Sequence, residues 1–299
     1  MKIKIAFSDG GHFCKSLVAK LFAGEYEFIY DQSNPDVLVY SLYGNEHRRF
    51  RCKKICVIGE NSFPDFNECD YAVSPHYIEF SRHLRVPFYA FNKEYEQLVM
   101  GDVQKVDAPE RRAFCGALVS NNRCADPTRA EFVGKLAARG LVCSAGGALN
   151  TMGRRVSSRP EFAENLEGRY TNPAKIKFQR GFKFSLALEN SSIEGYHTEK
   201  ITDAFASYSV PVYWGSESII REFDPRSFVN VSDFKTLDDA IDYMQSMPDA
   251  DYLKMLNFGG KVLRADYMDK FREFLRYAFA GPTFEHSYGN IRYQLEGTK

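Results

Sequence analysis

Apolar and polar positions alternate most regularly between Phe182 and Ser216. Every second residue from Phe182 to Leu188 is apolar, which predicts a strand. A polar loop at residues 189–197 follows, and the next apolar residues have the helical spacing i, i+3, i+4, i+7: Ile201, Ala204, Phe205 and Tyr208. Thr198 is a suitable N-cap for this helix. Because Val210–Tyr213 is again apolar, the segment predicts a βαβ unit with a parallel sheet.

The same alternation continues over the rest of the chain. Strands are predicted at residues 2–7, 27–31, 36–41, 55–58, 70–73, 113–120, 141–144 and 227–231. Helices are predicted at residues 13–23, 126–139, 217–221, 236–244 and 264–279. Strands that alternate with helices in this way predict the α/β fold class, with doubly wound sheets.

The length of 299 residues allows two domains of ordinary size. Residues 95–110 are polar and lead into the expected connection between the domains. We therefore expect one domain at residues 1–108, a second at 109–265, and a C-terminal helix and tail at 266–299.

Composition and charge exclude several classes of protein. Lys plus Arg and Asp plus Glu both number 39, so no net charge attracts the chain to nucleic acid. No apolar run approaches the roughly 20 residues that a transmembrane helix needs. The seven cysteines are irregularly spaced and no signal peptide precedes them, which predicts reduced thiols in a cytosol. The 25 Phe and 18 Tyr residues indicate ring-packed cores or sugar-stacking surfaces.

Two charged patterns allow a structural interpretation. Residues 47–54 are basic, which is typical of a solvated face; the alternative is a patch that faces an acidic glycan or an anionic membrane surface. Asp249 and Asp251 form an Asp-x-Asp triplet in a predicted helical connection, so we do not interpret them as metal ligands.

Two adjacent charges open the predicted helix after Thr198. Glu199 suits a helix N-terminus, whereas a cation such as Lys200 is unfavourable there by up to about 1 kcal/mol without a nearby anion. A helix N-terminus with a lysine at the carboxyl end of a parallel strand is a good phosphate site. Tyr196 can then hydrogen-bond the phosphate or a sugar, and Glu189 and Glu199 can accept bonds from ribose hydroxyls. The alternative is an i,i+3 pair of Lys200 with Asp203 on a solvated helix.

The residues around this helix resemble a family signature. The matching positions are Glu189, Asn190, Ser191, Tyr196, Thr198, Glu199, Lys200, Pro211, Tyr213, Trp214, Gly215 and Ser216. The pattern is similar to that of the bacterial α-1,3-fucosyltransferases of glycosyltransferase family 10. The resemblance implies a GT-B fold, in which two Rossmann-like domains face each other across a cleft. Residues 1–108 would bind the acceptor and 109–265 the GDP-sugar donor, and the helix of 266–299 can cross back to the first domain.

The resemblance extends into the first half of the chain. The matching residues there are Gly59, Glu60, Asn61, Pro64, Phe66, Asn67, Asp70, Tyr71 and Ala72. In the family, the glutamate of this segment is the proposed general base, which here is Glu60. Ser120 and Asn121 are also family-like and end a predicted strand, so we expect them at the donor site.

One position departs from the family pattern. Leu149 stands where the family has an arginine that is thought to hold the donor phosphates. Arg154 and Arg155 follow closely and could supply bidentate phosphate contacts, or they could be surface charges.

The resemblance implies a mechanism and a set of partners. L-fucose moves with inversion from GDP-fucose to the 3-OH of GlcNAc in an N-acetyllactosamine-type (Lewis-type) acceptor of a surface glycan such as lipopolysaccharide. Glu60 is the base, Lys200 stabilises the leaving GDP, and Glu199 holds the ribose. Tyr196 and Asn190 position the diphosphate or fucose. No metal site or obligatory cofactor is expected, although Mn²⁺ or Mg²⁺ could stimulate the reaction.

The expected location is the bacterial cytoplasm, with peripheral contact at the inner face of the membrane and no nucleic-acid partner. Two other functions stay open. Because of Leu149, the same fold could use another sugar nucleotide; alternatively, the chain could be a non-catalytic protein that binds a glycan or nucleotide.

Overall fold

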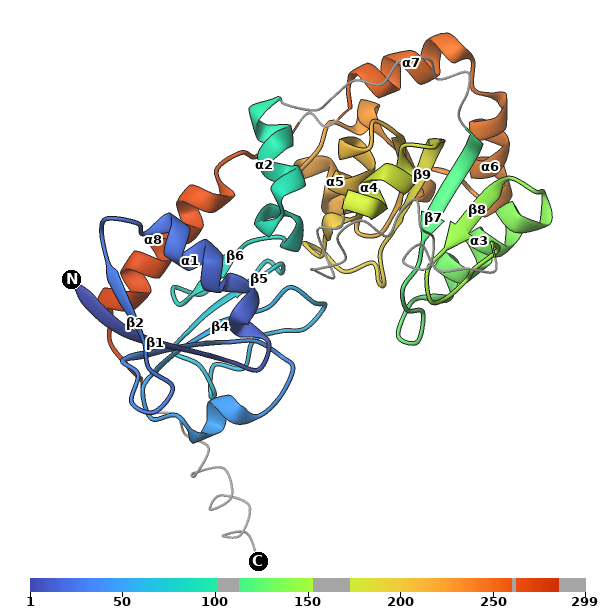
Figure 1. Ribbon diagram of the computed structural model, residues 1–299. Coiled ribbons are helices and arrows are strands. Elements are labelled where there is room, and N and C mark those ends of the chain that lie inside the picture. The colour runs from blue at the N-terminus through green and yellow to red at the C-terminus, as the bar shows by residue number, and fades with distance from the viewer. Residues whose placement is uncertain (102–112, 153–172, 260–261, 285–299) are drawn as a thin grey trace, which may run out of the picture. The chain divides into compact units, whose positions relative to one another are not determined.

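The computed structural model describes residues 1–101, 113–152, 173–259 and 262–284. The chain divides into two compact units (Figure 1). Unit 1 comprises Met1–Phe88 with Asp266–Lys299, and unit 2 comprises Tyr89–Ala265. The division falls between Phe88 and Tyr89, whereas the boundary was expected near residue 108. Residue 108 itself lies outside the described residues.

Unit 1 contains a six-stranded parallel sheet with the order β2-β1-β3-β4-β5-β6. Its strands are β1 Lys2–Ser8, β2 Glu27–Tyr30, β3 Val37–Tyr40, β4 Lys53–Val57, β5 Tyr71–Ser74 and β6 His83–Arg85. Every residue of β3, β4 and β5 is buried. Burial on both faces is the rule for a parallel sheet, and it explains why β3 and β5 are almost continuously apolar. The short strand β6 was not predicted from the sequence.

The helices of unit 1 come from both ends of its chain. They are α1 Lys15–Leu21 and α8 Tyr267–Ala280, with short 3₁₀ turns η1 Gly11–Cys14, η2 Glu46–Arg49 and η3 Phe88–Phe91 at its loops and boundary. The ring of Phe279 in α8 packs against Phe22, with centroids 5.5 Å apart. Tyr71 of β5 donates a hydrogen bond to the carbonyl of Pro282, just after α8. The last described helix of the chain therefore packs against elements from the beginning of the sequence.

The basic run at residues 47–54 is not one solvated face. His47, Lys53 and Lys54 are buried. Lys53 Nζ donates a 2.7 Å hydrogen bond to the carbonyl oxygen of Phe279. A cation at this end of α8 stabilises the unpaired carbonyl groups of its last turn. Half of the run thus has a structural role, and the patch available to an anionic surface is smaller than its sequence indicates.

Unit 2 contains a five-stranded parallel sheet with the order β11-β10-β9-β7-β8. Its strands are β7 Ala113–Leu118, β8 Val142–Ala145, β9 Phe182–Leu188, β10 Val210–Trp214 and β11 Val229–Asn230. Its helices are α2 Lys93–Met100, α3 Pro127–Ala138, α4 Pro173–Gln179, α5 Glu199–Ala206, α6 Leu237–Ser246 and α7 Asp249–Asn257. Three 3₁₀ turns complete the described unit: η7 Glu217–Arg221, η8 Pro225–Ser227 and η9 Val231–Asp233.

The predicted βαβ segment is confirmed as β9, α5 and β10. The two strands pair in parallel from Phe184–Val210 to Leu188–Trp214. Ile201, Ala204 and Phe205 of α5 are buried, as their spacing predicts. This geometry brings the loop after β9 and the start of α5 to the carboxyl edge of the sheet.

The expected polar approach to a linker, residues 95–110, is wrong for residues 95–100, which belong to helix α2, Lys93–Met100. Tyr95 and Leu98 are buried on one face, and Gly101 ends the helix in a left-handed conformation. The helix packs against α5. Glutamate and lysine are good helix formers, so a polar composition does not exclude a short helix whose stability comes from tertiary packing.

Candidate functional site

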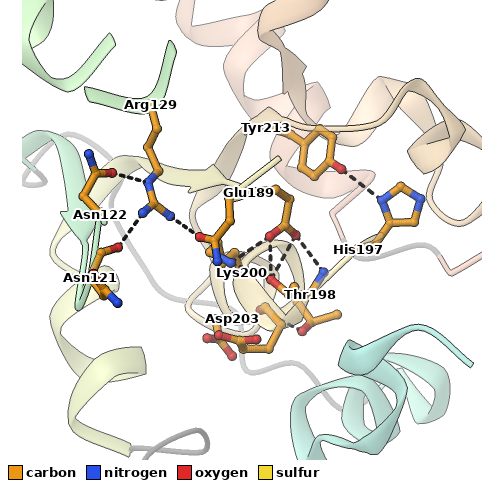
Figure 2. A network of polar contacts seen from close by, with 12 residues as sticks. Asn121, Asn122, Arg129, Glu189, His197, Thr198, Lys200, Asp203 and Tyr213 are labelled. Carbon is orange, nitrogen blue, oxygen red and sulfur yellow. Dashed lines mark hydrogen bonds and ion pairs between the residues drawn. The ribbon is translucent and has the colours of Figure 1, made fainter. Parts of the chain in front are cut away.

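The candidate site lies at the carboxyl edge of the unit 2 sheet, where the loops after β7 and β9 meet the N-terminus of α5. Figure 2 shows the polar contacts there, among them one group around Arg129 and another around Glu189 and Lys200. Open parallel sheets bind ligands at this edge because the strand ends leave backbone groups and helix N-termini available.

Glu189 is fully buried and is the centre of the second group. Its carboxylate accepts a 2.7 Å hydrogen bond from the backbone N–H of Thr198 and further bonds from the Thr198 hydroxyl. Its Oε2 lies 2.7 Å from Lys200 Nζ. A carboxylate in this place complements the positive end of the α5 dipole. The contacts of Glu189 are thus within the protein, and its expected contact with a ribose stays a prediction.

Thr198 occupies the expected N-cap position of α5, but its side chain makes no capping hydrogen bond. Its hydroxyl is instead shared by Glu189 and Lys200, and the Lys200 contact is 2.8 Å long. The proposed alternative pair of Lys200 with Asp203 does not form: Lys200 pairs with Glu189, and Asp203 pairs with Lys175 of α4. Lys200 keeps 22% of its side chain exposed, so its ammonium remains partly accessible at the helix N-terminus.

A second ion-pair cluster lies one turn further along α5. Lys175 Nζ contacts Asp203 and lies 3.4 Å from Glu199 Oε1. Burial raises the pKa of Asp203 to about 7, with the carboxylates of Glu199 and Glu94 adding to the rise and Lys175 opposing it. Burial also acts to raise the pKa of Glu199, but Lys175 and Lys200 hold that pKa below its usual value. Glu199 therefore stays charged, and its expected role at a ribose stays a prediction.

Arg129 of α3 connects the loops after β7 and β9. It is 4% exposed, and its guanidinium donates to the side-chain oxygens of Asn122 and Asn190 and to the carbonyl of Asn121. The backbone N–H of Asp126 also donates to the carbonyl of Asn190, at 2.8 Å. Sequence analysis placed Asn121 and Asn190 here but missed Arg129 and Asn122. An arginine on an amphipathic helix is usually solvated, so only the tertiary structure reveals its burial.

The remaining residues expected at this site differ in their surroundings. Ser120 is exposed and Tyr196 is 1% exposed. Next to Tyr196, the buried ring of His197 makes two hydrogen bonds of 2.9 Å. Its Nδ1 bonds to the Tyr213 hydroxyl and its Nε2 to the Ser218 hydroxyl. This network fixes the loop between β9 and α5.

Leu149 has a φ of 50°, a left-handed conformation that is uncommon for leucine. Its side chain is half-buried and packs against the apolar core of unit 2. An apolar side chain in this place contributes packing and cannot contact a phosphate as an arginine does. Arg154 and Arg155 lie outside the described residues.

Glu60, the expected base, lies in unit 1 just after β4. It is half-buried, and its Oε1 accepts a 3.0 Å hydrogen bond from the Tyr43 hydroxyl. Asp9, at the end of β1, fixes the loop that carries Tyr43: its carbonyl accepts from the Tyr43 N–H, and its carboxylate accepts from the N–H groups of Glu46 and His47. Tyr43 was not among the predicted site residues, because it follows β3 whereas its partner Glu60 follows β4.

The described residues contain neither a candidate metal cluster nor a membrane-spanning helix. None of their groups of His, Cys, Asp and Glu has three members placed to hold a metal ion. Within the same ranges, no helix is long and apolar enough to cross a membrane. The expectations about metal stimulation and membrane contact stay predictions.

The chain has two α/β units, each with a parallel sheet, and one sheet has a polar edge at a helix N-terminus. This is the architecture of the GT-B glycosyltransferases. Residues 4–92 match the family described as "Alpha-(1,3)-fucosyltransferase FucT N-terminal domain". Residues 108–273, more than half of the chain, match "Glycosyltransferase family 10 (fucosyltransferase) C-term". The chain belongs to glycosyltransferase family 10, the fucosyltransferases, as the signature around α5 indicated.

Individual relatives agree with this assignment. The chain is 31% identical over 226 residues to the alpha-(1,3)-fucosyltransferase FucT of Helicobacter pylori, an alignment that covers 64% of this chain and 44% of that protein. It is 35% identical over 68 residues to an alpha-(1,4)-fucosyltransferase of Arabidopsis thaliana, covering 23% of this chain and 17% of that one. The chain thus matches less than half the length of these curated relatives.

Solved structures resemble the chain over most of its length. A crystal structure of an alpha1,3-fucosyltransferase aligns with a TM-score of 0.77 and 26% identity, covering 95% of this chain and 92% of the other. A crystal structure of an alpha1,3-fucosyltransferase with GDP-fucose aligns over the same shares with a TM-score of 0.74.

Proposed function

We propose that the chain is an inverting α-1,3-fucosyltransferase that uses GDP-fucose as donor. The proposal rests on the position of Lys200 at the N-terminus of α5, at the carboxyl edge of a parallel sheet. Contacts with Glu189 and Thr198 hold its ammonium group there. A leaving diphosphate needs positive charge that is already in place, and a lysine with a helix N-terminus supplies it. The similar crystal structure with GDP-fucose supports this choice of donor.

Each residue then has a role in one displacement. The acceptor oxygen forms a bond to C1 of fucose while the bond from C1 to the β-phosphate oxygen breaks, and the bonding electron pair leaves with GDP. The acceptor proton passes to the carboxylate of Glu60, and Tyr43 orients that carboxylate through its hydroxyl. Lys200 and the α5 N-terminus stabilise the departing GDP. Glu199 holds the ribose, and Tyr196, Asn190, Ser120 and Asn121 position the donor.

The acceptor is the 3-OH of GlcNAc in an N-acetyllactosamine-type glycan. Unit 1 supplies the base and binds the acceptor, and unit 2 binds the donor. Neither unit alone therefore carries out transfer, because the base and the donor site belong to different units.

The test measures GDP release from GDP-fucose and N-acetyllactosamine, with the linkage of the product determined by NMR. We expect turnover in the wild type and a loss of roughly 100-fold in kcat for Glu60→Gln, the typical contribution of a general base. Lys200→Met should lose about 100-fold as well, since it removes a charge that stabilises the leaving group. Glu60→Gln should still bind GDP.

Matched surface variants serve as controls. Glu46→Gln changes an exposed glutamate of unit 1 that pairs with Arg49, and Lys254→Met changes an exposed lysine of unit 2 that pairs with Asp251. Both should keep wild-type turnover. Full activity of Glu60→Gln would refute the role of the base. Turnover with a UDP-sugar in place of GDP-fucose would favour the alternative hypothesis, suggested by Leu149, that the enzyme uses another sugar nucleotide.

A further inference from the structure

The guanidinium of Arg129 has an unusual set of partners for a buried charge. Its Nε donates to Asn122 Oδ1 at 2.8 Å, its Nη1 to Asn190 Oδ1 at 2.5 Å, and its Nη2 to the carbonyl of Asn121 at 2.5 Å. All three acceptors are neutral. Buried charges are usually paired with opposite charges, because removing an ion from water is unfavourable. Burial lowers the pKa of Arg129, yet an arginine stays protonated in proteins.

The carboxylate of Glu189 acts on Arg129 only through its longer-range field. Its oxygens contact Thr198 and Lys200. The direct contacts of the guanidinium therefore leave its positive charge available to an anion at the same sheet edge.

The contacts of Arg129 also settle the orientation of two side-chain amides. An arginine has only donors, so the oxygen of each amide must face it. The side-chain NH₂ groups of Asn122 and Asn190 consequently point away from Arg129. Asn122 lies on the loop after β7 (Figure 2), and Asn190 lies on the loop after β9; these two strands are adjacent and parallel in the sheet. The sheet edge thus presents amide donors with a buried cation behind them.

We propose that Arg129 is a positioning residue for the donor diphosphate, and that it provides the cation that Leu149 does not. It directs the NH₂ groups of Asn190 and Asn122 towards the phosphate oxygens and adds positive charge beneath the loops. This inference rests on the proposed function, since it assumes that a nucleoside diphosphate binds at this edge. Arg129 itself is too buried to act as a surface clamp.

The sharpest variant is Asn190→Asp. A carboxylate there still accepts from Arg129, with a stronger charge-assisted bond, so the fold is kept. It replaces the outward NH₂ donor with an oxygen and neutralises the charge of Arg129. We expect the affinity for GDP to fall at least about tenfold, because phosphate loses a donor and meets a negative charge. The affinity for guanosine, which has no phosphate, should change less than about twofold.

Arg129→Lys keeps the charge but loses the planar fork that orients both amides. We expect its GDP affinity to fall by about tenfold, again with little change for guanosine. Arg139→Gln is the matched control, because Arg139 follows the same helix and pairs with Asp238 and Asp242 near the surface. It should bind GDP as the wild type does.

Calorimetric titration of the full chain with GDP, GMP and guanosine measures these affinities, and a thermal melt verifies that each variant is folded. A fall in GDP affinity with guanosine affinity kept supports the proposal. Equal losses for GDP and guanosine would make Arg129 a purely structural residue and overturn it, as would wild-type GDP affinity in both variants. A wild type that binds no GDP would refute the proposed donor, and this inference with it, before any variant is compared.

Discussion

Lys200 Nζ lies 2.7 Å from Glu189 Oε2, and this pair joins the end of β9 to the first turn of α5. The pair explains how a lysine is tolerated at a helix N-terminus, where a cation is otherwise unfavourable. Glu189 supplies the required anion, and it does so from inside the protein, so the ammonium is fixed in place before any ligand binds. Such preorganised charge is more effective than charge that must rearrange during a reaction.

Glu189→Gln should weaken both stability and turnover. The amide keeps the shape of the carboxylate but removes the negative charge that pairs with Lys200 and accepts from Thr198. We expect unfolding free energy to fall by about 1–3 kcal/mol, the effect of breaking a buried charge-assisted bond. We also expect kcat to fall by about tenfold, because Lys200 is no longer held at its position. Urea unfolding and steady-state kinetics measure the two effects.

Glu194→Gln is the control for that variant. Glu194 pairs with Arg221, and both side chains are more than half exposed. Exposed pairs contribute little, so stability and kcat should both stay at wild-type values. An unchanged kcat in Glu189→Gln would contradict the positioning role of the pair.

The Asp203 cluster predicts a pH dependence of stability. Burial raises the pKa of Asp203 from its ordinary value of 3.8 to about 7, so the folded state binds a proton that the unfolded state releases. Stability is therefore greatest below about pH 4 with respect to this group, and is lost as the pH rises through 7. The slope for one proton is at most about 1.4 kcal/mol per pH unit.

Asp203→Asn should flatten this part of the stability curve, since its amide cannot titrate. Urea unfolding from pH 5 to pH 8 compares the two proteins. Glu199 has a lowered pKa, so its own contribution is present above about pH 4.5 and is lost only as the pH falls further. Its effect therefore lies outside the measured range. Parallel curves for wild type and Asp203→Asn would show that Asp203 is ionised in the folded protein throughout.

Tyr43→Phe should affect turnover more than binding. The change removes one hydroxyl, which donates to Glu60 Oε1 at 3.0 Å, and keeps the ring. If the hydroxyl orients the base, kcat should fall by roughly three- to tenfold while KM for GDP-fucose stays constant, as a single neutral hydrogen bond contributes about 1 kcal/mol. Tyr30→Phe is a matched control, because Tyr30 is a half-exposed tyrosine of β2 in the same unit. A rise in KM without a change in kcat would argue against the orienting role.

Lys53→Met should destabilise unit 1. The methionine fills the space of the lysine stem, but the carbonyl of Phe279 loses the hydrogen bond that ends α8. We expect a loss of about 1–2 kcal/mol in unfolding free energy, measured by urea unfolding. Lys2→Met, which changes an exposed pair with Glu27, should leave stability unchanged. A stable Lys53→Met protein would mean that water replaces the lysine at the end of the helix.

The sequence predicted the elements of the candidate site well because they depend on local periodicity. The alternation of Phe182–Leu188 and the helical spacing from Ile201 onwards correspond to β9 and α5. The partners of the charged residues could not be predicted in this way. Lys200 has Asp203 at a suitable helical spacing, yet it pairs with Glu189 across the loop, because α4 brings Lys175 to Asp203.

Arg129 and the helix α2 were missed for a related reason. Arg129 is sixty-one positions from Asn190 in the chain, and only the pairing of β7 with β9 brings them together. Residues 93–100 have a polar composition, and their helix is explained by packing against α5. Both errors concern tertiary contacts, which one-dimensional patterns of hydrophobicity do not contain.

The position of α8 affects how the protein folds during synthesis. The sheet of unit 1 is complete in sequence at Arg85, but the helix that covers Phe22 and accepts from Lys53 begins at Tyr267. A ribosome adds about 5–20 residues per second. All of unit 2 is synthesised between the last strand of the first sheet and α8, so many seconds pass before this helix is available. During that interval the apolar surface beneath α8 is uncovered. A nascent chain stopped before Asp266 should therefore bind chaperones and be degraded more readily than the full chain.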